Sequence, residues 1–141
     1  MAGRYHVPIL FHSGWEHAEY AEPDIVRDVS KQYSNINFIC CHTNYPKVTE
    51  CVKQLRDCRN VYFDLSSIAD DYLIAAGFRK LLSKQIHEMP ERFLFGSDYA
   101  GCDIKEHVVF INQLDISDIE KEMVFYNNAK RLYFLDITEE L

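Results

Sequence analysis

Short apolar runs alternate along this chain with longer segments whose apolar residues recur at helical spacing. The runs are Val7–Phe11, Ile36–Cys41, Val61–Leu65 and Phe93–Phe95. Each run is continuous rather than alternating, which is typical of strands buried on both faces of a parallel sheet. Pro8 is acceptable near the start of such a strand, where a missing N–H costs least. The pattern therefore predicts four parallel strands.

The segments between the runs predict helices, because their apolar residues fall three and four apart. Pro23 is suited to open the first helix and Pro90 to stop the third, which has Gly77 as a candidate interruption. Ser117 and Glu120 have the spacing of a capping box. The expected helices cover residues 23–33, 45–55, 70–89, 104–114 and 127–135, and a short one follows Ser117.

Length and charge limit the function classes. The 141 residues suffice for one domain, 1–141, and no linker composition divides them. The formal net charge of −7 and the lack of a basic cluster argue against a nucleic-acid partner. No apolar run approaches the roughly 20 residues that cross a bilayer, and the first is too short for a signal peptide. We therefore expect no membrane partner and a cytoplasmic location.

The five cysteines favour neither a disulfide framework nor a cysteine-rich zinc site. Their number is odd and they lack paired CxxC spacing. Cys40 and Cys41 fall inside the second apolar run, where a buried thiol is a poor nucleophile. The cysteines are therefore expected to be small buried side chains.

Polar residues suited to metal or proton chemistry follow three of the four apolar runs. His12 and His42 come after the first two runs and Asp98 after the fourth. The carboxyl ends of parallel strands share one edge, so these side chains are expected to converge. Two histidines and a carboxylate are an acceptable ligand set for Zn²⁺, Fe²⁺ or Mn²⁺. The structural alternatives are hydrogen-bonded histidines and a turn-forming or helix-capping aspartate.

Other candidates carry weaker signals. Trp15 and His17 lie in the loop after the first run and could contact a small-molecule substrate, although a solvated loop is the simpler interpretation. Asp64 could face the site or cap a loop, and the structural role is favoured. No phosphate-binding glycine motif and no GxSxG nucleophile motif occurs. The histidines expected on the surface or in packing are His6, His87 and His107.

The order of the motifs resembles the C-terminal half of the amidohydrolase-related family (amidohydrolase 2 type), which are metal-dependent (β/α)8 barrels. The pieces are PILFHSG, CCHTN, NVYFDLS, RFLFGSDYAG and NNAKRLYFL. The resemblance implies an α/β fold of parallel β/α units, strands five to eight of a TIM barrel, with extra C-terminal helices. It implies a divalent metal, Zn²⁺ first and Mn²⁺ or Fe²⁺ as alternatives, held by His12 and Asp98. It further implies His42 and Asp98 as catalytic groups, with Asp98 as general base and then acid.

Two departures leave the function open. Thr43–Tyr45 follow His42, where the family has small residues or glycine, and the first-strand H-x-H ligand pair is absent. A full barrel also takes about 250 residues. The chain could thus be a truncated product that has lost the metal, a subunit completed by a partner chain or a second copy, or a non-catalytic remnant. The functions considered are a metal-dependent hydrolase acting on a carbonyl-type substrate, a decarboxylase on the same scaffold, and a non-catalytic interaction subunit.

Overall fold

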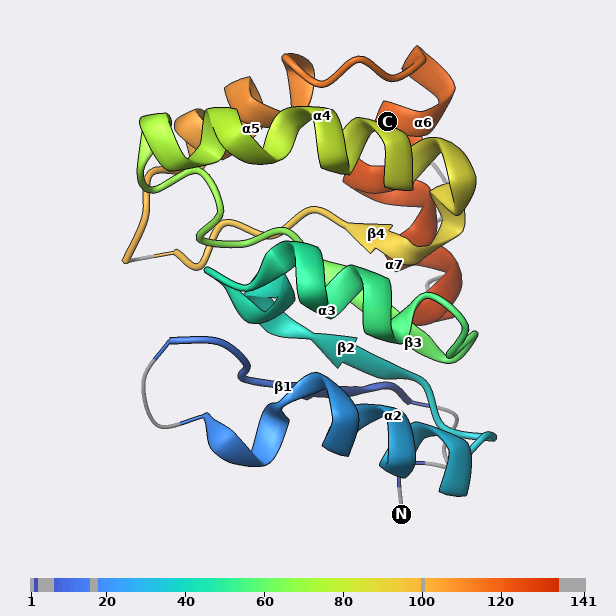
Figure 1. Cartoon of the computed structure of the whole chain (residues 1–141). Helices are drawn as coiled ribbons and strands as arrows, with labels where there is room; N and C mark the ends of the chain where they lie inside the picture. The colour runs from blue at the N-terminus through green and yellow to red at the C-terminus, as the bar shows by residue number, and fades with distance from the viewer. Residues whose placement is uncertain (1, 3–6, 16–17, 100, 135–141) are drawn as a thin grey trace.

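Four parallel strands form the centre of the computed structural model, which describes residues 2, 7–15, 18–99 and 101–134 (Figure 1). The strands are β1 (Ile9–Phe11), β2 (Phe38–Cys40), β3 (Val61–Asp64) and β4 (Phe93–Leu94). They pair in the order β1-β2-β3-β4, with every pair parallel. The prediction of an α/β fold with four parallel β/α units is confirmed.

The helices follow the predicted segments, with differences at their ends. Helix α4 runs through Gly77 without interruption, and α3 begins at Val48 rather than near Tyr45, so that predicted start is wrong. The capping box is present, with Ser117 and Glu120 bonding each other's backbone N–H. The elements are η1 (Glu19–Ala21), α2 (Pro23–Gln32), η2 (Cys41–Asn44), α3 (Val48–Leu55), α4 (Tyr72–Glu88), η3 (Pro90–Arg92), α5 (Ile104–Asn112), α6 (Asp118–Glu122), the π-helical turn η4 (Met123–Asn127) and α7 (Asn128–Leu132). The predicted terminal helix is thus divided between η4 and α7, and residue 135 lies outside the described residues.

One face of the sheet carries the main hydrophobic core. Alternate strand residues point to this face, including Phe38, Cys40, Val61, Phe63 and Phe93, and all are buried against the helices. The rings of Phe63 and Phe93 stack with centroids 5.2 Å apart. Because the strands are short, each contributes only one or two residues to this core.

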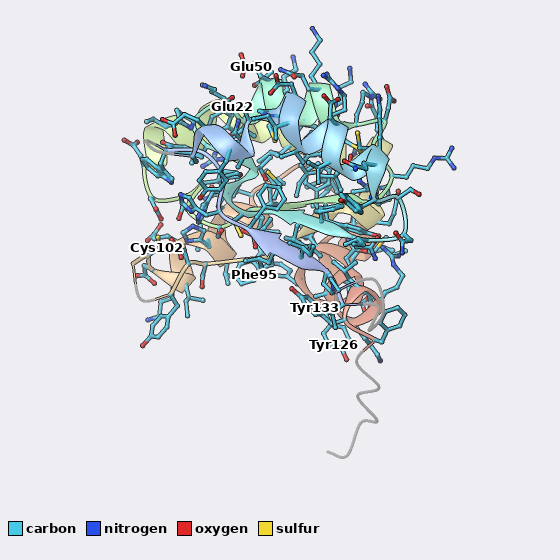
Figure 2. All side chains as sticks on the ribbon, turned by 90° about the horizontal axis from the view of Figure 1, so that it is seen from below. Glu22, Glu50, Phe95, Cys102, Tyr126 and Tyr133 are labelled. Carbon is cyan, nitrogen blue, oxygen red and sulfur yellow. The ribbon has the colours of Figure 1, made fainter. Side chains whose placement is uncertain are left out.

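The opposite face of the sheet is covered only in part. Ile39 and Leu94 are buried beneath Leu132 of α7, with Tyr62 and Ala129 packed against them. In Figure 2, Glu22 and Glu50 mark the helix-covered side of the sheet, while Tyr126 and Tyr133 lie on the other side. Among the described residues, no element covers the part of this face around Leu10, which is 58% exposed.

Strand β1 is exposed, and the prediction that it is buried on both faces is wrong. Ile9 and Leu10 are exposed, with 58% of Leu10 accessible. The reason is its position: β1 is an edge strand that pairs with β2 alone in the described chain. Strand β2 lies inside the sheet, and its three residues are all buried as expected.

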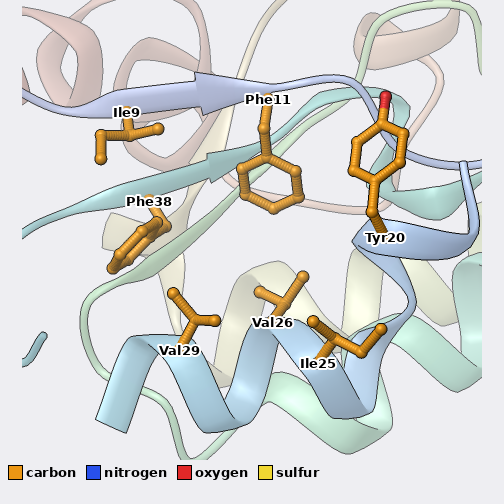
Figure 3. A pocket seen from close by; sticks show the side chains of 7 residues that line it. All are labelled: Ile9, Phe11, Tyr20, Ile25, Val26, Val29 and Phe38. Atoms are coloured by element: carbon orange, nitrogen blue, oxygen red, sulfur yellow. The ribbon is translucent and has the colours of Figure 1, made fainter. Parts of the chain in front are cut away.

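An apolar groove of about 180 Å³ lies between β1 and α2 (Figure 3). Ile9 and Phe11 of the strand face Val26 and Val29 of the helix across it, with Tyr20 at one end. The groove shows that the edge of the helix-covered core is incompletely filled. Within the described residues, no helix is long and apolar enough to span a membrane.

Candidate active site

A hollow of about 350 Å³ opens on the second face of the sheet, at the carboxyl ends of the strands. Polar side chains from all four strand ends meet there. The residues that line it are Leu10, His12, Cys41, His42, Asp64, Ser66, Gly96 and Asp98. The structure thus brings together His12, His42 and Asp98, which the sequence placed after three different strands.

The two histidines are in contact but differ in exposure. The His12 and His42 rings lie edge to face, with centroids 5.1 Å apart. His12 is exposed, whereas only 6% of His42 is accessible. Asp98 is exposed and accepts a hydrogen bond from the hydroxyl of the buried Ser67 at 3.2 Å. One exposed imidazole, one buried imidazole and one hydrogen-bonded carboxylate therefore share the hollow.

Left-handed backbone conformations gather at the same edge of the sheet. Every strand is followed by at least one non-glycine residue with φ between 48° and 59°. Such conformations are costly for side chains with a Cβ, and they cluster at functional sites. These residues are Trp15, His42, Thr43, Asn44, Ser67 and Asp98.

The loop after β1 is fastened to the loop after β2. The Ser13 hydroxyl donates to the Cys41 carbonyl at 2.5 Å and accepts from the Asn44 N–H at 3.1 Å. Gly14 has a φ of 77°, and a Cβ there would lie 2.2 Å from the Tyr45 carbonyl oxygen. A side chain at position 14 would therefore separate the two loops that carry His12 and His42.

Ser66 was not among the predicted site residues, yet it bonds two of the groups that line the hollow. Its hydroxyl lies 2.9 Å from His42 Nδ1 and makes a short hydrogen bond to the Asp64 carboxylate. The Asp64 Oδ1 also accepts the Ser66 N–H at 3.0 Å, and Thr43 donates to the Asp64 carbonyl at 2.7 Å. The sequence feature that could have identified Ser66 is its position two residues after Asp64, in the segment DLS at the end of a strand.

The cysteine in the hollow is a neutral thiol. Burial, with the nearby Asp64 carboxylate as a smaller cause, raises the pKa of Cys41 to about 12. Burial also raises the pKa of Tyr133, with Cys41 and Asp64 adding to the effect. Neither group supplies an anion near neutral pH, so Cys41 is a poor nucleophile.

Of the two predicted substrate-binding residues, Trp15 does not line this hollow. Trp15 is 52% exposed, packs with its ring centroid 4.8 Å from that of Tyr45, and lines a neighbouring polar hollow with Glu22 and Lys47. His17 lies outside the described residues. Of the other histidines, His107 is buried in packing and His87 pairs with Glu120, whereas position 6 is outside the described range.

The side chains in the hollow are of types that bind a divalent metal, but too few of them are arranged around one point to hold an ion. Imidazole nitrogens and carboxylate oxygens are ordinary zinc and manganese ligands. Among the described residues, however, no three His, Cys, Asp or Glu side chains are arranged to hold an ion. His42 Nδ1 is also engaged by Ser66. The described chain therefore presents part of a ligand set.

Comparisons with known proteins extend this description. The chain is similar to an uncharacterised TIM-barrel protein from Bordetella bronchiseptica, with 23% identity, a TM-score of 0.73, and coverage of 93% of this chain and 47% of that one. It is similar to a dihydroxybenzoic acid decarboxylase from Polaromonas sp. JS666 with bound manganese and 2-nitroresorcinol. The identity is 18%, the TM-score is 0.63, and the match covers 99% of this chain and 53% of that one. It is also similar to an amidohydrolase from Burkholderia multivorans with bound zinc. The identity is 14%, the TM-score is 0.67, and the match covers 89% of this chain and 52% of that one.

These likenesses show the fold, a partial TIM barrel, because the chain spans about half the length of each solved structure. No curated protein matches the sequence. The family model described as Amidohydrolase matches residues 1–135, nearly the whole chain. The chain therefore belongs to the amidohydrolase family.

Proposed function

We propose that the chain supplies half of the active site of a metal-dependent hydrolase that acts on a carbonyl-type small molecule. The observation that supports this most directly is the shared hollow. His12, His42 and Asp98 come from the ends of β1, β2 and β4, and they line one open cavity at the face where TIM barrels carry their chemistry.

In this proposal His12 and Asp98 hold a divalent ion, with Zn²⁺ first and Mn²⁺ or Fe²⁺ as alternatives. A bound ion supplies Lewis-acid activation of water or of a substrate carbonyl. At least one further ligand must be supplied, because among the described residues no three His, Cys, Asp or Glu side chains are arranged to hold an ion.

The remaining steps belong to side chains of the chain. The Asp98 carboxylate takes a proton from the attacking water and returns it to the leaving group, as a general base and then acid. The Ser67 hydroxyl fixes the orientation of that carboxylate through its hydrogen bond of 3.2 Å. His42, buried beside the same cavity, carries a proton to or from the substrate. Trp15 and His17 are the residues that we propose for contact with the substrate.

The open edges of the sheet support completion by further β/α units. In the described chain β1 pairs only with β2, and β4 only with β3. Exposed edges favour pairing with another strand, and eight strands close a barrel of this type. We propose that a partner chain or a second copy of this chain supplies the missing strands and ligands.

A decarboxylase on the same scaffold is the second candidate. It is favoured by the similarity to a solved dihydroxybenzoic acid decarboxylase. In that case His42 and Asp98 would manage the proton that replaces the carboxyl group.

The proposal is tested by assaying the chain with Zn²⁺ or Mn²⁺ against panels of amides, lactones and aromatic carboxylic acids. Released acid reports hydrolysis and released CO₂ reports decarboxylation. We expect Asp98→Asn to lower kcat by about 10²-fold or more, as expected for loss of general acid–base catalysis. His87→Ala, in which the lost imidazole lies on α4, should retain full activity. Activity that is equal in Asp98→Asn and the unaltered chain would contradict the proposal. Absence of turnover would favour a non-catalytic subunit only if it persists when the missing strands and ligands are supplied.

A further inference from the structure

Three side chains form a continuous hydrogen-bonded series beside the hollow. Asp64 ends β3, Ser66 follows it, and His42 lies in η2 after β2. The Ser66 Oγ contacts both the Asp64 Oδ1 and the His42 Nδ1, the latter at 2.9 Å. The backbone N–H of His42 also donates to the Asp64 Oδ1, at 3.4 Å. The series therefore connects a carboxylate to an imidazole through a single hydroxyl.

The direction of each hydrogen bond follows from the number of protons available. An ionised carboxylate only accepts, and Asp64 Oδ1 already accepts from the Ser66 N–H at 3.0 Å. The one hydroxyl proton of Ser66 is therefore donated to Asp64. The Ser66 oxygen is left to accept from His42 Nδ1, so this ring nitrogen must carry a proton.

We infer that Asp64 and Ser66 are positioning residues that hold His42 in its Nδ1–H tautomer and leave Nε2 as the unprotonated ring nitrogen. This inference deepens the function proposed above and rests on it for its catalytic meaning. A base or ligand at the hollow needs a nitrogen lone pair, and the tautomer of a neutral histidine is set by the partner of its other nitrogen. Asp64, expected from the sequence to be structural, thus acts on the candidate site through Ser66.

The burial of the series makes the tautomer specific. Ser66 is 5% exposed and His42 is 6% exposed, so water has little access to replace the hydroxyl. The η2 backbone is held as well, because Thr43 donates to the Asp64 carbonyl at 2.7 Å. The imidazole and the hydroxyl are therefore presented to each other by two loops that are tied together.

Gly96 gives an independent way to disturb the series without removing any of its groups. A Cβ at position 96 would lie 2.3 Å from Asp64 Oδ2 and 2.9 Å from its Cγ. The backbone of Gly96 is not left-handed, so alanine is conformationally acceptable there. Gly96→Ala should therefore displace the Asp64 carboxylate while Ser66 and His42 stay intact.

The test is the tautomer of His42, read from long-range ¹H–¹⁵N NMR spectra of the 141-residue chain at a pH where the ring is neutral. His42→Gln identifies the signals of this ring. We expect the Nδ1–H form in the unaltered chain. In Ser66→Ala the ratio of tautomers should move about tenfold toward Nε2–H, since one hydrogen bond is lost. Gly96→Ala should move the ratio in the same direction. Ser66→Thr keeps the hydroxyl and should therefore keep the ratio of the unaltered chain.

Ser67→Ala is the matched control, because this neighbouring buried serine bonds Asp98 instead of His42. It should leave the His42 tautomer unchanged. An Nε2–H form in the unaltered chain, or a ratio that neither Ser66→Ala nor Gly96→Ala alters, would overturn the inference. This readout needs no turnover. A correct tautomer in a chain without activity would therefore count against the proposed function alone.

Discussion

The two faces of the sheet belong to the same four apolar strands, but they have different roles. On the helix-covered face, Phe63 and Phe93 are completely buried and stack on each other. On the other face, Leu10 is largely exposed, while His12 and Asp98 line an open hollow. The stability of the chain is therefore concentrated on one face and its candidate chemistry on the other. Continuous apolar strands are typical of sheets that are buried on both faces, which agrees with the proposal that further β/α units cover the second face.

The largest difference between the faces should appear when a large side chain is removed from each. Phe63→Ala should lower the free energy of unfolding by about 3–5 kcal/mol, because it removes a buried ring and leaves a cavity. Leu10→Ala should change it by less than about 0.5 kcal/mol, because the side chain is already exposed to water. Urea denaturation measures both. Equal losses would mean that the open face is covered in solution, for example by a second copy.

Two glycine substitutions should have opposite signs on the two sides of the molecule. Gly14→Ala forces a left-handed φ of 77° on alanine and brings its Cβ against the Tyr45 carbonyl, so we expect a loss of about 1–3 kcal/mol. Gly77→Ala lies inside α4 with open space around it, and should stabilise the chain by about 0.5–1 kcal/mol. Thermal unfolding followed by circular dichroism compares them. A stabilising Gly14→Ala would show that the rim of the hollow does not depend on that close contact.

The smallest expected effect is a pH dependence that arises in the helix layer. The Ser117 hydroxyl, and less strongly its N–H and His87, lower the pKa of Glu120 below its ordinary value of 4.5. A lowered folded pKa stabilises the fold above the unfolded value, and this contribution is lost as the pH falls through the folded pKa. Because the group is near the surface, we expect less than about 1 kcal/mol.

Glu120→Gln should remove that part of the acid dependence below pH 4.5, as measured by urea unfolding at a series of pH values. Asp98→Asn on the open face serves as the comparison. If the acid dependence were lost in Asp98→Asn and kept in Glu120→Gln, the effect would arise on the open face, and the prediction would be contradicted.

The sequence predicted the covered face better than the open one, for a physical reason. Periodicity reports which residues prefer burial, and this located all four strands and the helices around Phe38 and Phe63. It cannot report whether a covering layer is present, so the exposure of Leu10 on the open face was missed.

The candidate site could be predicted only as far as position along the strands allows. The strand-end rule brought His12, His42 and Asp98 to one edge of the sheet. Ser66 could not be found in that way, because its importance depends on a hydroxyl lying 2.9 Å from a ring nitrogen 24 residues away. The offset of Trp15 from the hollow likewise depends on how its loop packs against Tyr45.

The most direct test of the central claim is the binding of Zn²⁺ and Mn²⁺ to the chain, measured by calorimetry with His12→Ala, Asp98→Asn and the control His87→Ala. The account predicts that the unaltered chain binds an ion. It predicts that His12→Ala and Asp98→Asn each weaken that binding by about tenfold or more, and that His87→Ala does not, because its imidazole is paired with Glu120 on the helix side. Binding that is unchanged in His12→Ala and Asp98→Asn would contradict the assignment of metal chemistry to the open face.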